Sequence, residues 1–144
     1  MKKTLFIIIA LVLIAGAGYW IFQKNTNQQS ISPDRLAHLD KIRVEQPLDN
    51  AVISSPSKVT GQARGVWYFE ASFPVRLLDA NGKELARIPA QAQGEWMTEN
   101  FVPFTAELNF SQPSTDTGTL ILEKDNPSGL PQNSDQLSIP IRFK

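Results

Sequence analysis

The residue types best suited to recognition stand together in one short stretch of the chain, Trp67-Tyr68-Phe69-Glu70. Trp and Tyr side chains combine a flat apolar face with a hydrogen-bond donor, which suits stacking against a glycan or a peptide strand. One interpretation is therefore a binding surface made of Trp67, Tyr68, Glu70 and the more distant Trp96. The alternative, which the sequence favours, is that Trp67 and Tyr68 cover the end of a β-domain core.

Three carboxylates, those of Glu70, Glu95 and Glu99, lie in or near these aromatic stretches. A pair of carboxylates can act as general acid and base on a glycosidic bond, but only at a defined separation. The spacing along the chain brings no two of them to such a separation. The sequence therefore predicts no catalytic residues and a protein that is not an enzyme.

Oxygen-bearing side chains also gather in the segment 125–129 (DNPSG), with Glu123 and Asp135 nearby. Calcium prefers such ligands, yet the segment lacks the spacing of an EF-hand loop, and Asn-Pro-Ser-Gly is typical of a turn. The chain has no Cys, and its one histidine is His38, so a His-based zinc site or triad would depend on that residue. We predict no metal and no cofactor, and we interpret His38 as an exposed linker residue.

The charge balance argues against a nucleic-acid partner. Lys and Arg total 14, Asp and Glu total 14, and the net charge is +0. Proteins that bind nucleic acid usually carry a basic face or stripe.

An apolar segment without charged residues extends from Thr4 to Phe22. As a helix its 19 residues would span about 28 Å, close to the ~30 Å hydrocarbon thickness of a bilayer. We predict a single-pass anchor, with Tyr19 and Trp20 at the outer interface and the N-terminus in the cytoplasm. The alternative is a signal peptide cleaved after Ala17, with the domain secreted. In both cases everything after residue 22 is exported.

The remaining chain divides by composition into two parts. Residues 23–40 begin with a polar, Asn- and Gln-rich run without periodicity, which predicts a tether. Residues 41–144 consist of short alternating apolar and polar runs separated by Pro, Gly, Asn and Asp, which predicts strands joined by turns.

The alternation in residues 69–79 is regular enough to assign side chains to faces. It places these residues on one buried face: Phe69, Ala71, Phe73, Val75 and Leu77. Pro74 interrupts this run and predicts an edge position or a bulge, and Asn81-Gly82 predicts a hairpin turn. About seven such strands without an internal helix predict an all-β, immunoglobulin-like sandwich of two sheets.

Specific segments also resemble a known family. They are the entry SPSKVTGQA (55–63), the pair Phe69-Glu70 and the hairpin LLDANG (77–82). Residues 42–143 resemble, through these segments, the bacterial immunoglobulin-like domain first named for spore germination proteins.

The resemblance implies an extracytoplasmic module, displayed here behind a membrane anchor, and it transfers no catalytic residue and no link to sporulation. We expect non-catalytic binding of an envelope protein or of cell-wall glycan. A structural subunit or spacer of a membrane complex is the alternative, and an envelope glycan hydrolase is a weaker third.

Overall fold

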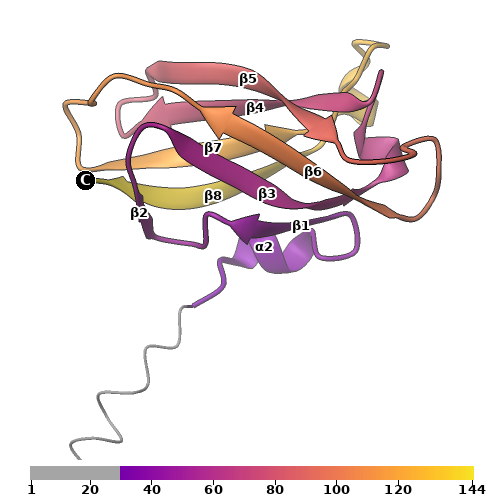
Figure 1. The fold of residues 1–144 in the computed structure, drawn as a ribbon, viewed down its shortest axis with the longest axis horizontal. Helices are drawn as coiled ribbons and strands as arrows, with labels where there is room; N and C mark the ends of the chain where they lie inside the picture. The colour runs from indigo at the N-terminus through magenta and orange to yellow at the C-terminus, as the bar shows by residue number, and fades with distance from the viewer. Residues whose placement is uncertain (1–29) are drawn as a thin grey trace, which may run out of the picture. The chain divides into compact units, whose positions relative to one another are not determined.

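The structure is a computed structural model that describes residues 30–144 (Figure 1). The predicted anchor, residues 1–22, and the predicted tether up to residue 29 lie outside the described residues. Among the residues that are described, no helix is both long and apolar enough to cross a bilayer.

Short strands dominate the described chain. The strands are β1 (Ile42–Gln46), β2 (Ala51–Ile53), β3 (Ser57–Arg64), β4 (Ser72–Asp79), β5 (Glu84–Ala92), β6 (Phe101–Leu108), β7 (Thr117–Glu123) and β8 (Gln136–Phe143). Three short helical segments accompany them: α2 (Pro33–Ala37), η1 (Gly65–Trp67) and η2 (Pro131–Asn133).

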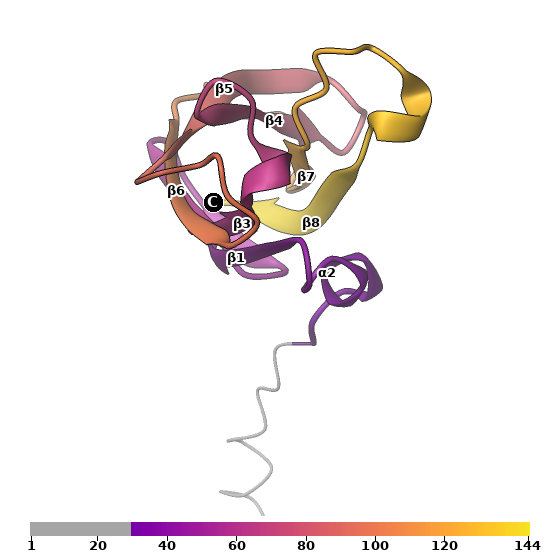
Figure 2. The same cartoon turned by 90° about the vertical axis from the view of Figure 1, so that its right-hand side faces the viewer.

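The eight strands form one sheet in the order β1-β3-β6-β5-β4-β7-β8-β2. Neighbours pair antiparallel except β2 and β8, which are parallel. Figure 2 shows that the sheet curls around its core, with α2 outside the ring beside β1 and β8. The all-β prediction is confirmed. The two expected sheets are joined into one, because β5 and β6 pair at Gln91–Thr105 and Ala92–Phe104, and β2 is a strand that the sequence did not predict.

The core lies on the inner side of this curled sheet, where the period-two pattern predicted it. Phe73, Val75 and Leu77 of β4 have no exposed surface. Aromatic rings meet edge to face at its centre, with 5.2 Å between the ring centroids of Tyr68 and Phe73 and 5.0 Å between those of Phe73 and Phe104. This geometry is the one that aromatic quadrupoles favour.

The period-two prediction for residues 69–79 is wrong at its first residue. Phe69 is exposed, because the chain turns between Phe69 and Ser72 and β4 begins only at Ser72. Phe69 and Ser72 exchange two backbone hydrogen bonds of 2.9 and 3.1 Å, and the residues between them, Glu70 and Ala71, both have positive φ. This is the geometry of a type I′ turn, which sequence reasoning expects at Asn-Gly.

The Asn81-Gly82 hairpin forms as predicted, but by a different turn. Only Gly82 has positive φ, and the carboxylate of Asp79 accepts hydrogen bonds from the N–H groups of Asn81 and Lys83, each at 2.9 Å. An Asp side chain that satisfies the following backbone is a common way to stabilise such loops.

The prediction for Pro74 is confirmed only locally. Strand β4 as a whole is not an edge strand, because it has β5 on one side and β7 on the other, and its irregularity lies between Leu77 and Leu78. The ladder to β7 starts only at Val75, one residue later, which accommodates a residue without an N–H group.

The folded unit begins at Ile31, ten residues before the boundary that composition suggested. Residues 31–41, here called the strap, pack on the sandwich instead of forming part of a tether. The strap mixes polar and apolar residues, and its polar side chains bind partners that lie far away in the sequence. No local pattern predicts these contacts.

Candidate functional site

The strap is positioned by its helix α2, which the sequence specifies locally. The Ser32 hydroxyl accepts a hydrogen bond from the Arg35 N–H at 3.3 Å as the N-cap, and Pro33 occupies the start of the helix. Both features are typical of a helix start.

Two side chains of α2 connect β1 and β8 through hydrogen bonds to their backbones. On one side the Asp34 carboxylate accepts a hydrogen bond of 2.7 Å from the N–H of Ser138 in β8. On the other side the buried Arg35 donates to the carbonyl of Val44 in β1 and pairs with Asp49 at 3.3 Å. The edge strand β1 and the part of β8 that β2 does not cover thus each have a backbone group satisfied by the strap.

His38 ends the helix and is held from several directions, so its assignment as an exposed linker residue is wrong. Its Nδ1 lies 2.7 Å from the Asp34 carbonyl and its Nε2 lies 3.0 Å from the Asp135 carboxylate. Lys41 pairs with the other oxygen of Asp135 at 2.7 Å, and the imidazole meets the Trp67 ring edge to face at 6.3 Å.

These contacts shift two pKa values. Burial works to lower the pKa of His38, but the hydrogen bonds to Asp34 and Asp135 and the charges of both carboxylates raise it above 6.5 overall. Burial works to raise the pKa of Asp135, but the hydrogen bonds and charges of Lys41 and His38 lower it below 3.8 overall. The protonated imidazole and the ionised carboxylate therefore stabilise each other.

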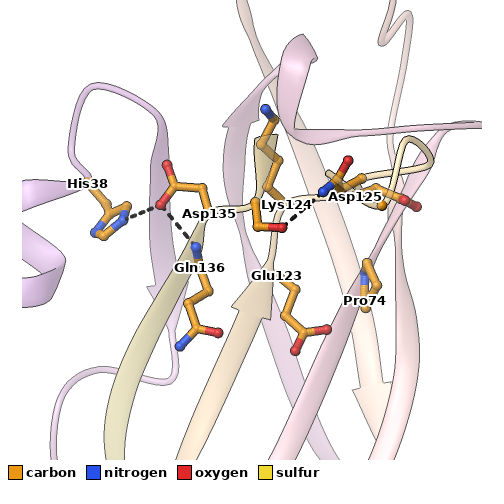
Figure 3. Close-up of a pocket in the computed structure, with 10 residues that line it drawn as sticks. His38, Pro74, Glu123, Lys124, Asp125, Asp135 and Gln136 are labelled. Carbon is orange, nitrogen blue, oxygen red and sulfur yellow. Dashed lines mark hydrogen bonds and ion pairs between the residues drawn. The ribbon is translucent and has the colours of Figure 1, made fainter. Parts of the chain in front are cut away.

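A polar cleft of about 760 Å³ opens beside this pair (Figure 3). It lies where β7 ends and β8 begins, next to the end of α2. Its lining consists of His38, Pro74, Glu123, Lys124, Asp125, Asn126, Gly129, Ser134, Asp135 and Gln136.

The β7–β8 loop that forms one wall is held by its own side chains. The Asn126 amide donates to the Leu130 carbonyl and to the Ser134 hydroxyl, both at 2.9 Å, and the Ser128 hydroxyl donates to the Asn126 side-chain oxygen at 2.5 Å. Of the oxygens considered as calcium ligands, those of the Asn126 and Ser128 side chains are thus used within the loop. No group of three or more His, Cys, Asp or Glu side chains among residues 30–144 can hold a metal ion.

Two polar side chains in the cleft remain available. Figure 3 shows the Asp125 carboxylate and the Gln136 amide at the cleft wall, and neither side chain makes a hydrogen bond or ion pair to another described residue. By contrast, Glu123 pairs with Arg76 at 2.8 Å. A partly buried carboxylate beside an exposed amide, both without partners among the described residues, favours a ligand that supplies N–H donors or a positive charge.

His38 is not placed to transfer a proton to a substrate in the cleft. Both nitrogens of His38 already face acceptors, so the imidazole has no free position to act as a base. The hydroxyl of Ser134 accepts from Asn126 and contributes no nucleophile–base pair with His38. The Asp125 carboxylate and the Gln136 amide are the groups of the cleft that can offer polar contacts to a ligand.

Two of the four residues predicted as a binding surface lie in the core. Trp67 and Tyr68 are 1% and 4% exposed, so the aromatic surface that contains them is excluded. The Tyr68 hydroxyl donates to the Val102 carbonyl at 2.6 Å, and burial raises the pKa of this phenol. The Trp67 carbonyl accepts a hydrogen bond of 3.0 Å from the N–H of Asp125, so the backbone of Trp67 helps to position this cleft residue.

The other two predicted residues do not line the cleft. Glu70 is exposed in the Phe69–Ser72 turn, and Trp96 lies half-buried in the β5–β6 loop. Whether either residue binds a ligand stays a prediction.

The residues that do line the cleft had weak signals in the sequence. In the sequence Asp125 belongs to a segment typical of a turn, and no motif singles out Gln136. His38 and Asp135 are 97 positions apart. Only the packing of the strap brings them together.

Comparison with family models identifies the domain. Residues 41–129 match the Gmad2 model, described as the immunoglobulin-like domain of bacterial spore germination. Comparison with curated proteins gave no match. The matched residues make up more than half of the chain and contain β1 to β7, the strap's last residue and the start of the cleft loop. The chain therefore belongs to the family of immunoglobulin-like domains of bacterial spore germination.

Proposed function

We propose that this protein is a non-catalytic, membrane-anchored module that binds a partner in the bacterial envelope through the polar cleft. The observation that carries the proposal is the pair Asp125 and Gln136, two polar side chains without a partner among the described residues, on the wall of a cleft held in shape by its own hydrogen bonds. A wall that is ordered before binding lowers the entropic cost of recognition.

The chemistry of the cleft favours a peptide segment of an envelope protein over a glycan. Backbone N–H groups or a Lys or Arg side chain match the Asp125 carboxylate. Glycan sites commonly use an exposed aromatic face, whereas Trp67 and Tyr68 are buried.

The location of the protein is part of the proposal. The apolar segment 4–22 supports a single-pass anchor with the domain outside the cell. Intact-mass measurement of the membrane fraction tests it: we expect the complete chain, whereas a mature chain that starts at Gly18 means cleavage and secretion.

Photo-crosslinking tests the cleft. A benzoylphenylalanine in place of Gln136 should form an adduct with an envelope protein, and one in place of Asp116 should not. Asp116 is exposed just before β7, at the opposite end of the strand from the cleft.

A second substitution makes the test specific. Asp125→Asn should reduce the adduct at position 136 about tenfold, because a charged hydrogen bond is lost, and Asp116→Asn should leave it unchanged. No adduct at position 136, in a chain that still co-purifies with a membrane complex, means that the spacer role is correct instead.

A further inference from the structure

The strap has its polar and apolar sides reversed with respect to an ordinary surface helix. Arg35 is 6% exposed and the His38 side chain 12% exposed, both facing the sandwich. Ile31, Leu36 and Leu39 point outward and are 52%, 54% and 40% exposed. Surface helices usually bury their apolar residues and expose their charges.

The reversal follows from what the strap covers. Its inner side must provide an acceptor for the N–H of Ser138 and a donor for the carbonyl of Val44, and only polar side chains can do so. The apolar residues of the strap are therefore left on the outer side, where nothing in the described part of the chain covers them.

Two further apolar side chains extend this surface. The Ser32 N–H contacts the Asp49 carboxylate, which brings the start of the strap to the β1–β2 turn and its exposed Leu48. Val52 follows in β2, exposed while its neighbour Ile53 points into the core. Figure 1 shows α2, β1 and the turn to β2 along one side of the molecule. We call the following residues the apolar face: Ile31, Leu36, Leu39, Leu48 and Val52.

The position of this face in the chain indicates what covers it. Eight residues, 23–30, separate the end of the apolar segment at Phe22 from Ile31. Eight residues span at most about 28 Å, whatever their conformation. If the segment 4–22 crosses the bilayer, Ile31 is held within that distance of the lipid headgroups.

We propose that the apolar face lies on the outer surface of the bilayer that the anchor crosses, with its leucines and isoleucine among the headgroups. The inference rests on the proposed anchor, and it goes further by assigning the orientation of the domain. Apolar side chains at the headgroup boundary bind lipid through buried area, and the anchor supplies the second attachment that stable binding needs. Asp34 and Asp40 flank the leucines of the strap, so attachment should not require anionic lipid.

Site-directed fluorescence on the full chain tests the orientation. The sequence has no Cys, so Leu36→Cys and Leu48→Cys each provide one position for an environment-sensitive label. Gln91→Cys is the matched control, because Gln91 is exposed and belongs to β5. Figures 1 and 2 show β5 on the opposite side of the ring from α2. The labelled chains are reconstituted into phosphatidylcholine vesicles that contain a lipid-borne quencher.

We expect quenching at positions 36 and 48 and none at 91. We also expect Leu36→Ser with Leu39→Ser to reduce the quenching at position 48, and circular dichroism to show an unchanged β-domain, because both leucines are exposed. A chain that floats with the vesicles while labels at 36 and 48 stay as unquenched as the label at 91 overturns the inference and leaves the anchor in place. A chain that does not float overturns both.

Varying the ratio of protein to lipid in the vesicles distinguishes contact of the apolar face with lipid from contact with a second copy of the chain. Quenching that persists at high lipid dilution supports contact with lipid. Shielding that disappears on dilution means that another copy covers the face, and the inference is then wrong.

Discussion

Arg35 lies almost wholly buried, where its guanidinium donates to the carbonyls of Val44 and Pro47 and pairs with the Asp49 carboxylate. The planar group and its five N–H donors suit three acceptors that lie close together, which a lysine cannot match. At this scale the strap is held by charge-assisted hydrogen bonds.

Arg35→Ala should lower the free energy of unfolding by about 3 kcal/mol, because it removes one partner of a buried pair and leaves buried carbonyls unsatisfied. Urea unfolding of residues 31–144, followed by Trp fluorescence, measures this. Arg87→Ala is the control: Arg87 is half-exposed in the surface network with Glu84 and Glu123, and its loss should cost about 0.5 kcal/mol or less. Equal effects of the two substitutions contradict the role of Arg35.

The pair His38 and Asp135 makes stability depend on pH. The raised pKa of His38 stabilises the fold fully below pH 6.5, and this contribution is lost as pH rises through the pKa of the folded state. The lowered pKa of Asp135 stabilises the fold above pH 3.8, and this contribution is lost as pH falls through its folded pKa.

The stability advantage of the native chain over His38→Gln should therefore be largest between pH 3.8 and 6.5 and should shrink at alkaline pH. The difference in urea midpoint between the two chains, measured from pH 3.8 up to alkaline pH, checks this prediction. If this difference in midpoint instead grows as the pH rises above 6.5, the change has the opposite sign, and a protonated His38 in the folded state is contradicted.

At the scale of elements, the turn between Phe69 and Ser72 stands out, because Glu70 and Ala71 adopt φ values of 50° and 61°. Residues other than Gly, Asn and Asp adopt these values at a cost. The preceding Trp67 and Tyr68 are buried and the following Phe73 is buried, so the chain must reverse within two residues whatever their types.

Ala71→Gly should raise the free energy of unfolding by about 0.5–1 kcal/mol, because relief of the left-handed conformation exceeds the added freedom of the unfolded chain. Ala80→Gly provides the comparison. Ala80 is exposed in the β4–β5 turn and is not among the described residues with positive φ, so glycine there should be neutral or destabilising. Thermal unfolding of both variants measures the contrast, and stabilisation by both would refute the explanation.

For the whole molecule, the boundary of the folded unit decides which fragment is stable. A fragment of residues 42–144 contains every strand but lacks the strap, so Val44 and Ser138 lose their partners. We expect it to be less stable than residues 31–144 by about 3 kcal/mol or more.

Urea unfolding of the two fragments tests this boundary, with a fragment of residues 23–144 as the control. Adding residues 23–30 to the folded unit should not change the midpoint. If residues 42–144 are as stable as residues 31–144, the strap is not part of the folded unit.

Much of the fold could be predicted because it depends on local patterns. The alternation in β4, β6 and β8 assigns the core side chains directly, since a strand sends successive residues to opposite faces. The Asn81-Gly82 hairpin and the Ser32-Pro33 helix start are likewise readable, because turns and caps are decided by a few adjacent residues.

The candidate site could be predicted only in part. The oxygen donors of the segment after β7 are visible in the sequence, but Asp135 and the strap residue His38 meet through contacts between distant parts of the chain. Aromatic character alone could not distinguish a buried Trp67 from an exposed one, because large apolar residues serve both in cores and in binding surfaces.

The sequence by itself determined the all-β class, the family, the apolar segment 4–22 and the absence of cysteine chemistry, since each depends on composition or on short-range order. Only the tertiary structure decided that residues 31–41 belong to the domain, that Trp67 and Tyr68 are buried, and that Asp125 and Gln136 share a cleft. These outcomes depend on which backbone groups are left unpaired at β1 and β8, and unpaired groups exist only once the sheet has formed.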